Sequence, residues 1–110
     1  MTVWYAVQDL DAARRFYRDK LGFTEMFFDA EEGWSRLERN GSDIALSTAE
    51  LESGDAVAHV EVEDVKAEAE RLRSDGVDVG VVLELHGEMR LLEITDPDGN
   101  RLELGQPLRP

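Results

Sequence analysis

The sequence predicts an α+β fold in which two βαβββ modules form a curved, mixed sheet shaped as an open cup. Two amphipathic helical patterns are each preceded by one β-rich segment and followed by three. The two halves of the chain also resemble each other in their residues. The length of 110 residues is that of one domain. A half of roughly fifty residues would bury its sheet face poorly if it stood alone.

The first half is expected to begin with a strand over Thr2–Gln8, which is rich in Val, Trp and Tyr. Asp9 is the candidate N-cap of a helix that ends near Leu21, because apolar residues recur there at helical spacing and Gly22 follows. Turn sequences then separate three strand candidates, which are Glu25–Asp29, Trp34–Arg39 and Asp43–Thr48.

The second half repeats this order. Ala56–Glu63 is a candidate strand, Asp64 a candidate N-cap, and Val65–Ser74 a candidate helix that Gly76 ends. The remaining strand candidates are Val77–Leu85, Met89–Thr95 and Arg101–Leu104, the last of them preceded by the turn sequence Asp96-Pro97-Asp98-Gly99-Asn100.

The repeat can be read directly in the residues. Around the two helix starts, Val7-Gln8-Asp9-Leu10-Asp11-Ala12 resembles Val62-Glu63-Asp64-Val65-Lys66-Ala67. Toward the ends of the halves, Gly41-x-x-Ile44-x-Leu46 resembles Gly99-x-x-Leu102-x-Leu104. We therefore expect one domain over residues 1–110, made of a first module over 2–52 and a second over 55–106.

The charge balance excludes whole classes of partner. Twelve Lys and Arg face 25 Asp and Glu, which gives a net charge of −13. No basic stripe is present, so neither a nucleic acid nor an anionic membrane is expected as a partner. The Arg14-Arg15 pair is expected to lie on a solvated helix face. Cys is absent, so neither a disulfide framework nor a thiolate zinc site is expected. The N-terminus lacks the features of a signal peptide and the apolar runs are too short to span a membrane, so a cytoplasmic location is expected.

Three motifs in order resemble the vicinal oxygen chelate superfamily, which groups glyoxalase I, bleomycin-resistance proteins and extradiol dioxygenases. The opening motif is Val7-x-Asp9-Leu10-x-x-Ala13-x-x-Phe16-Tyr17-x-x-x-Leu21-Gly22-Phe23. The middle motif is Val62-x-Asp64-Val65-x-Ala67 with Gly76-Val77, and the closing motif is Asp96-Pro97-Asp98-Gly99-Asn100-x-x-Glu103-Leu104. The resemblance implies a glyoxalase/bleomycin-resistance-like fold and a cup commonly completed by a second subunit.

Alternation along each strand sorts the side chains between the helix side and the cup. The residues expected to face the cup are Trp4, Ala6, Trp34, Arg36, Ala45, Ser47, Val57, His59, Glu61, Arg90, Leu92 and Glu103. Aromatic walls with a few polar groups suit a flat or cationic molecule. We therefore predict that a ligand binds Trp4, Trp34, Arg36, Ser47, His59, Glu61, Arg90 and Glu103. Phe27 and Phe28 are expected either to line the cup or a dimer interface, or to pack as ordinary strand residues.

Metal-dependent relatives use four inward positions filled by His, Glu or Gln. Motif alignment transfers these positions to Thr2, Ala45, Val57 and Glu103. Only Glu103 is a good ligand, so the resemblance implies that the family's metal site is lost and no cofactor is favoured. A divalent metal remains possible at a displaced site built from His59, Glu61 and Glu103. His86 is expected to be an exposed loop residue.

The leading functional hypothesis is a metal-independent, homodimeric protein that binds a small aromatic or cationic compound, in its sharpest form an antibiotic that it sequesters. Two alternatives stay open. One is a lyase, isomerase or dioxygenase with a metal site rebuilt near His59 and Glu103. The other is an interaction module whose cup is filled by its own side chains.

Overall fold

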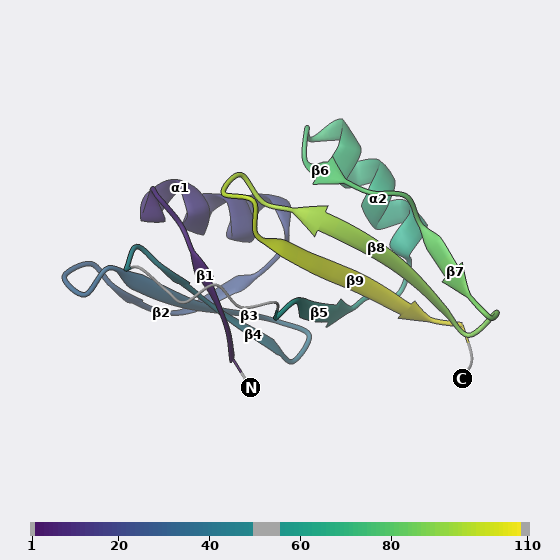
Figure 1. Cartoon of the computed structure of the whole chain (residues 1–110), viewed down its shortest axis with the longest axis horizontal. Coiled ribbons are helices and arrows are strands. Elements are labelled where there is room, and N and C mark those ends of the chain that lie inside the picture. Colours follow the sequence, from purple (N-terminus) through teal and green to yellow (C-terminus); the bar gives the residue numbers. More distant parts are fainter. Residues whose placement is uncertain (1, 50–55, 109–110) are drawn as a thin grey trace.

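The computed structural model describes residues 2–49 and 56–108, and its elements follow the predicted order (Figure 1). The first half contains β1 (Thr2–Ala6), α1 (Leu10–Arg15), the π-helical segment η1 (Phe16–Lys20), β2 (Thr24–Asp29), β3 (Trp34–Arg39) and β4 (Ser42–Ser47). The second half contains β5 (Ala58–Glu61), α2 (Val65–Ser74), β6 (Asp78–Val79), β7 (Leu83–Leu85), β8 (Met89–Thr95) and β9 (Arg101–Pro107). The α+β class is confirmed.

The strands form two sheets with the same internal order. The first sheet runs β1-β4-β3-β2, and the second runs β5-β9-β8-β6 with β7 also paired to β8. In each, the strand before the helix lies parallel to the last strand, and the other neighbours are antiparallel. One helix covers one face of each sheet (Figure 1). The predicted module boundaries at residues 52 and 55 lie outside the described residues.

Both helices begin where the sequence indicates. The carboxylates of Asp9 and Asp64 accept hydrogen bonds from the amides three residues further on, at 3.0 Å in each case, and so satisfy free donors of the first turn. Gly22 ends the first helical segment with a φ of +71°, a conformation that costs glycine little. The first helix differs from expectation in its second half, where η1 widens to π-type turns and the Leu21 amide donates to the Phe16 carbonyl.

The segment predicted as one strand over Val77–Leu85 is two short strands instead. β6 and β7 both pair with β8, and the chain between them leaves the ladder. At the break, the Gly80 amide still donates to the Glu93 carbonyl of β8 at 2.9 Å. A glycine inside a strand often marks such an interruption, because it has no side chain to pack.

One continuous core joins the two halves. It contains the helix-facing side chains of both sheets together with α1, η1 and α2. Within it, the Tyr17 hydroxyl of η1 donates to the buried Asp96 carboxylate of the second half at 2.6 Å. Burial, reinforced by Asp96, raises the pKa of Tyr17. Across the described residues, no helix has the length and apolarity needed to span a bilayer.

Candidate ligand-binding site

Three aromatic rings lie together on the side of the first sheet that points away from α1. The ring centroids of Trp4 and Trp34 are 5.4 Å apart, and those of Phe27 and Trp34 are 4.8 Å apart. These separations are typical of favourable aromatic contacts. Trp4 is 50% exposed and Phe27 46%, so both rings present area to solvent. We call Trp4, Trp34 and Phe27 the aromatic face.

Two small residues form the floor between these rings. Ala45 is the register partner of Trp4, and Ser47 is the register partner of Trp34. Both are buried although they point away from α1, because large neighbours flank them. Ser47 was expected to line the cup, but it is only 4% exposed and its hydroxyl accepts the Ala49 amide at 3.1 Å. Ser47 therefore packs beneath the rings.

The polar groups beside the aromatic face are mostly acidic. Arg36 lies across from Phe27, and its Nε atom is 4.0 Å from the Asp43 carboxylate. Pairing of Asp29 with Trp34 and of Glu38 with Asp43 places three carboxylates on this side against one guanidinium, a balance of −2. The potential over the rings therefore favours a cation.

The second sheet carries a polar pair on the side away from α2. His59 of β5 and Glu103 of β9 are register partners, and the imidazole Nδ1 lies 2.8 Å from the carboxylate Oε1. Glu93 of β8 is the register partner of Glu103 and is exposed. Glu61 lies on the same side, as the register partner of Gly105. We call His59, Glu61, Glu93 and Glu103 the acidic face.

Gly105 leaves room for the imidazole. A Cβ atom at this position would lie 2.7 Å from Nε2 of His59 and closer still to Cε1, which no real Cβ tolerates. The bare backbone of β9 thus lets the ring lie over the strand beside Glu103. The predicted strand ended at Leu104, so this glycine was missed. A glycine in a strand interior is itself the signal for such a close approach.

Two residues expected in the cup lie on the other side of the second sheet. Leu92 is fully buried in the core beneath α2, so the expectation for this residue is wrong. Arg90 lies on the same side of the sheet as Leu92, because the two residues are two positions apart in β8. The Nε atom of Arg90 donates a hydrogen bond to Glu84 of β7 at 3.2 Å. The pairing of Glu93 with Glu103 fixes this assignment, since it places the odd-numbered residues of β8 on the acidic face.

The donor set does not fit the metal site of metal-dependent relatives. Of the four transferred positions, Ala45 and Val57 have no donor atom, and the best ligand, Glu103, is paired with His59. For the displaced site, the structure brings His59 and Glu103 together. Among residues 2–49 and 56–108, however, no three His, Asp or Glu side chains come close enough to hold an ion. A catalytic ion normally needs three protein ligands.

Comparison with known proteins places the fold in a family. Residues 2–104 match the model of the Glyoxalase/Bleomycin resistance protein/Dioxygenase superfamily. The chain belongs to this superfamily. No match is found among curated proteins.

Three solved structures have a similar fold. The integron cassette protein HFX_CASS4, from the mobile metagenome of a Halifax Harbour sewage outfall, has a TM-score of 0.82 and 23% identity over 96% of each chain. TnmS3, an antibiotic binding protein from Streptomyces sp. CB03234, has a TM-score of 0.77 and 26% identity over 96% of this chain and 93% of its own. Lactoylglutathione lyase from Agrobacterium tumefaciens has a TM-score of 0.78 and 20% identity over 96% and 91%.

Proposed function

We propose that this superfamily member is a metal-independent binding protein that holds a planar, cationic small molecule against the aromatic face. The observation that carries the proposal is the cluster of tilted rings of Trp4, Trp34 and Phe27, two of which are well exposed. Indole faces attract cations and flat ring systems alike. The carboxylates beside the rings favour a positively charged ligand.

The acidic face is proposed as the polar part of the same function. The acidic face has three carboxylates, those of Glu61, Glu93 and Glu103. They face the single guanidinium of Arg101, which lies 3.7 Å from the Glu93 carboxylate. Because TnmS3 is described as an antibiotic binding protein, sequestration of a basic antibiotic is the sharpest form of the proposal. The lyase among the similar structures supports an enzyme as the alternative. The donor set around Glu103 lacks a third ligand among the described residues, and this argues against a metal-dependent version.

Ligand titration tests this proposal with an intrinsic probe. The chain has two Trp residues, Trp4 and Trp34, so Trp fluorescence reports only on the aromatic face. A planar acridine cation should quench this emission and bind, whereas a naphthalene sulfonate of similar size should bind at least ten times more weakly. Calorimetry on Trp4→Ala should show roughly tenfold weaker binding of the acridine.

Lys66→Ala is the matched control, since it trims an exposed side chain on α2, in the second half of the chain and away from both tryptophans. Its acridine affinity should equal that of the wild type. Equal loss in both variants would point to non-specific adsorption. Absence of binding across a panel of aromatic cations would refute the proposal. Metal analysis of protein purified without chelator tests the enzyme alternative, which predicts close to one ion per chain.

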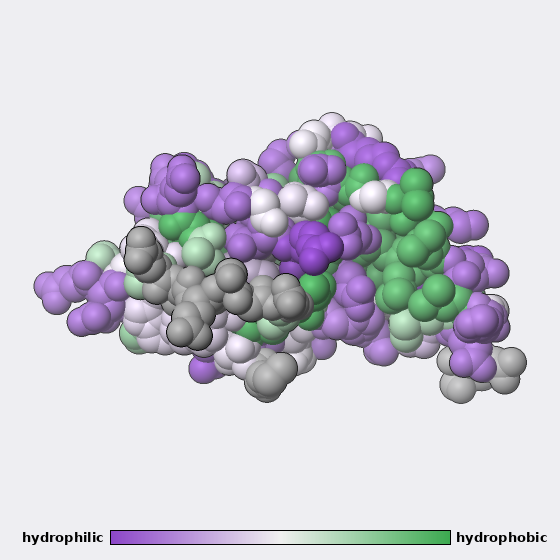
Figure 2. Space-filling model, viewed as in Figure 1, coloured by the Kyte–Doolittle hydropathy of each residue, from purple (hydrophilic) through white to green (hydrophobic). Residues whose placement is uncertain are grey.

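We also propose that the protein is a homodimer. Exposed apolar surface supports this, because large side chains stay uncovered on the aromatic face and on the edge of the second sheet. Figure 2 shows apolar surface gathered over the region of β7, where Val81, Leu83 and Leu85 are exposed. Sedimentation at micromolar concentration should give twice the chain mass of 12.4 kDa. A mass equal to one chain at all concentrations would contradict it.

A further inference from the structure

Phe27 reaches the aromatic face only because β2 contains a bulge. Glu25 pairs with Leu37, but Phe27 pairs with Arg36, so Met26 is an extra residue in the ladder. In a regular strand Met26 would stand opposite Arg36, and Phe27 would point toward α1. The extra residue therefore puts Phe27 in place of Met26 opposite Arg36, and Asp29 in place of Phe28 opposite Trp34. As a result, Phe27 is the ring that contacts Trp34 from this strand.

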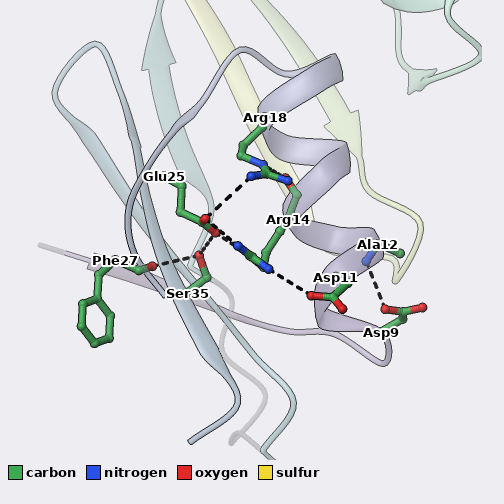
Figure 3. Close-up of polar contacts among 8 residues, drawn as sticks. All are labelled: Asp9, Asp11, Ala12, Arg14, Arg18, Glu25, Phe27 and Ser35. Carbon is green, nitrogen blue, oxygen red and sulfur yellow. Dashed lines mark hydrogen bonds and ion pairs between the residues drawn. The ribbon is translucent and has the colours of Figure 1, made fainter. Parts of the chain in front are cut away.

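Charged side chains connect Glu25, the residue just before the bulge, to α1 (Figure 3). The Arg14 guanidinium of α1 donates from Nε and Nη2 to the two Glu25 oxygens, at 2.6 and 2.7 Å. Both side chains are only 16% exposed, so the expectation that Arg14 is solvated is wrong. Arg18 lies 3.8 Å from the same carboxylate. Hydrogen bonding to Arg14 is the main reason that the pKa of Glu25 is lowered to about 2.

The same network also contacts the residues after the bulge. The buried Ser35 hydroxyl of β3 lies 2.6 Å from Glu25 Oε2 and 3.1 Å from the Phe27 carbonyl oxygen, so its proton is shared across the bulge (Figure 3). On the helix side, the Arg14 guanidinium stacks over the Phe28 ring at 3.4 Å from the centroid. Arg14 and Ser35, which both contact the Glu25 carboxylate, therefore also contact the residues after the bulge.

We propose that Glu25 is a positioning residue for ligand binding: with Arg14 and Ser35 it fixes the bulge at Met26 and thereby holds the Phe27 ring against Trp34. The proposal rests on the function proposed above. Glu25, Arg14 and Ser35 lie on the helix side of the first sheet, so these side chains would not contact the ligand themselves.

Replacement of Glu25 by Gln tests this role. The amide has the same shape but loses the charge that binds Arg14, so the bulge should loosen and Phe27 should leave Trp34. In the ligand-free protein, the emission maximum and near-UV circular dichroism of the two tryptophans should change. Affinity for the acridine cation should fall about fivefold. Ser35→Ala removes only the bridging hydroxyl and should cause a smaller change in the same direction, which keeps the test valid if Glu25→Gln does not fold.

Glu68→Gln is the matched control for a merely structural role. Glu68 of α2 is 15% exposed and, like Glu25, it binds two arginines, Arg39 and Arg71. Its replacement should lower stability to a similar degree but leave the tryptophan spectra and the acridine affinity unchanged. Equal spectral effects from both substitutions would overturn the proposal.

A double variant separates positioning from general destabilisation. Phe27→Leu should by itself weaken acridine binding, and addition of Glu25→Gln should then weaken it no further, because Glu25 acts through that ring. Additive losses would contradict the proposal. If neither the acridine nor any other aromatic cation of the panel binds the wild type, the function proposed above fails. The spectral comparison of the ligand-free variants still decides whether Glu25 positions Phe27.

Discussion

At the scale of single residues, one absent side chain shapes the acidic face. Gly105 leaves space above β9, and the His59 imidazole fills it while bonding to Glu103 through Nδ1. Glu103 occupies the position that metal-dependent relatives are expected to use for their ion. In this chain the partner of Glu103 is the His59 imidazole.

Gly105→Ala should therefore displace His59. The added methyl group overlaps the ring, so the His59–Glu103 contact should be lost. Nitrogen NMR of the imidazoles measures this, because the chain has only two His residues and His86, which is exposed in a turn, is an internal reference. The ring nitrogen shifts of His59 should move while those of His86 stay. Unchanged His59 shifts would show that the ring lies elsewhere.

At the scale of elements, α1 and β2 depend on each other through charge. The polar side of α1 provides the arginine that neutralises Glu25, and β2 provides the carboxylate that satisfies the arginine. A paired, half-buried carboxylate of this kind contributes more than an exposed ion pair, because solvent screens it less. The contribution requires that Glu25 be ionised.

This requirement predicts a pH dependence. The pKa of Glu25 falls from 4.5 to about 2 on folding, so its contribution to the free energy of unfolding is fully present above pH 4.5 and is lost as the pH falls toward 2. Urea denaturation should show that Glu25→Gln is less stable than the wild type by about 1–3 kcal/mol at pH 7. The difference should shrink steadily between pH 4.5 and 2. A difference independent of pH would contradict the ionic account. Glu70→Gln, on an exposed site of α2, should have little effect at any pH.

At the scale of the whole molecule, the two halves share their core and their buried polar contacts. Tyr17 of the first half bonds to Asp96 of the second, and the Asn100 side chain donates to the Ala6 carbonyl at 2.9 Å. The Tyr5 hydroxyl donates to the Arg101 carbonyl and accepts the Ala58 amide at 3.0 Å. Neither half can lose its structure without exposing the apolar surface of the other.

The shared core predicts cooperative unfolding. Both tryptophans lie in the first half, so their fluorescence follows that half, while far-UV circular dichroism follows the whole chain. The two urea transitions should coincide. Separate midpoints would show that the halves unfold independently.

Removal of one inter-module hydrogen bond should lower the stability of the whole domain. Tyr17→Phe keeps the ring but deletes its hydrogen bond to Asp96, which should lower the free energy of unfolding by about 1–3 kcal/mol. Denaturation followed by both probes measures the loss, and the midpoints should fall together. Phe16→Leu, at the neighbouring and less buried position, should cost less. An equal or smaller loss for Tyr17→Phe would contradict a stabilising role for the hydroxyl.

The sequence by itself determined the order of the helices and strands and the bounds of several of them. Asp9 and Asp64 signal helix starts through their own carboxylates, and the predicted bounds of Val65–Ser74, Trp34–Arg39 and Met89–Thr95 are those observed. Caps, periodicity and turns act over a few residues, so they can be read locally. The two tryptophans were also placed on one face correctly, because β1 and β3 are regular strands where alternation holds.

Only the tertiary structure decided which face the remaining side chains occupy. The bulge at Met26 put Phe27 rather than Phe28 on the aromatic face, and the pairing of β8 with β9 put Glu93 rather than Leu92 on the acidic face. Gly105 mattered because a histidine from a distant strand lies above it. These outcomes depend on the register between segments far apart in the chain, and a shift of one residue reverses every side chain beyond it.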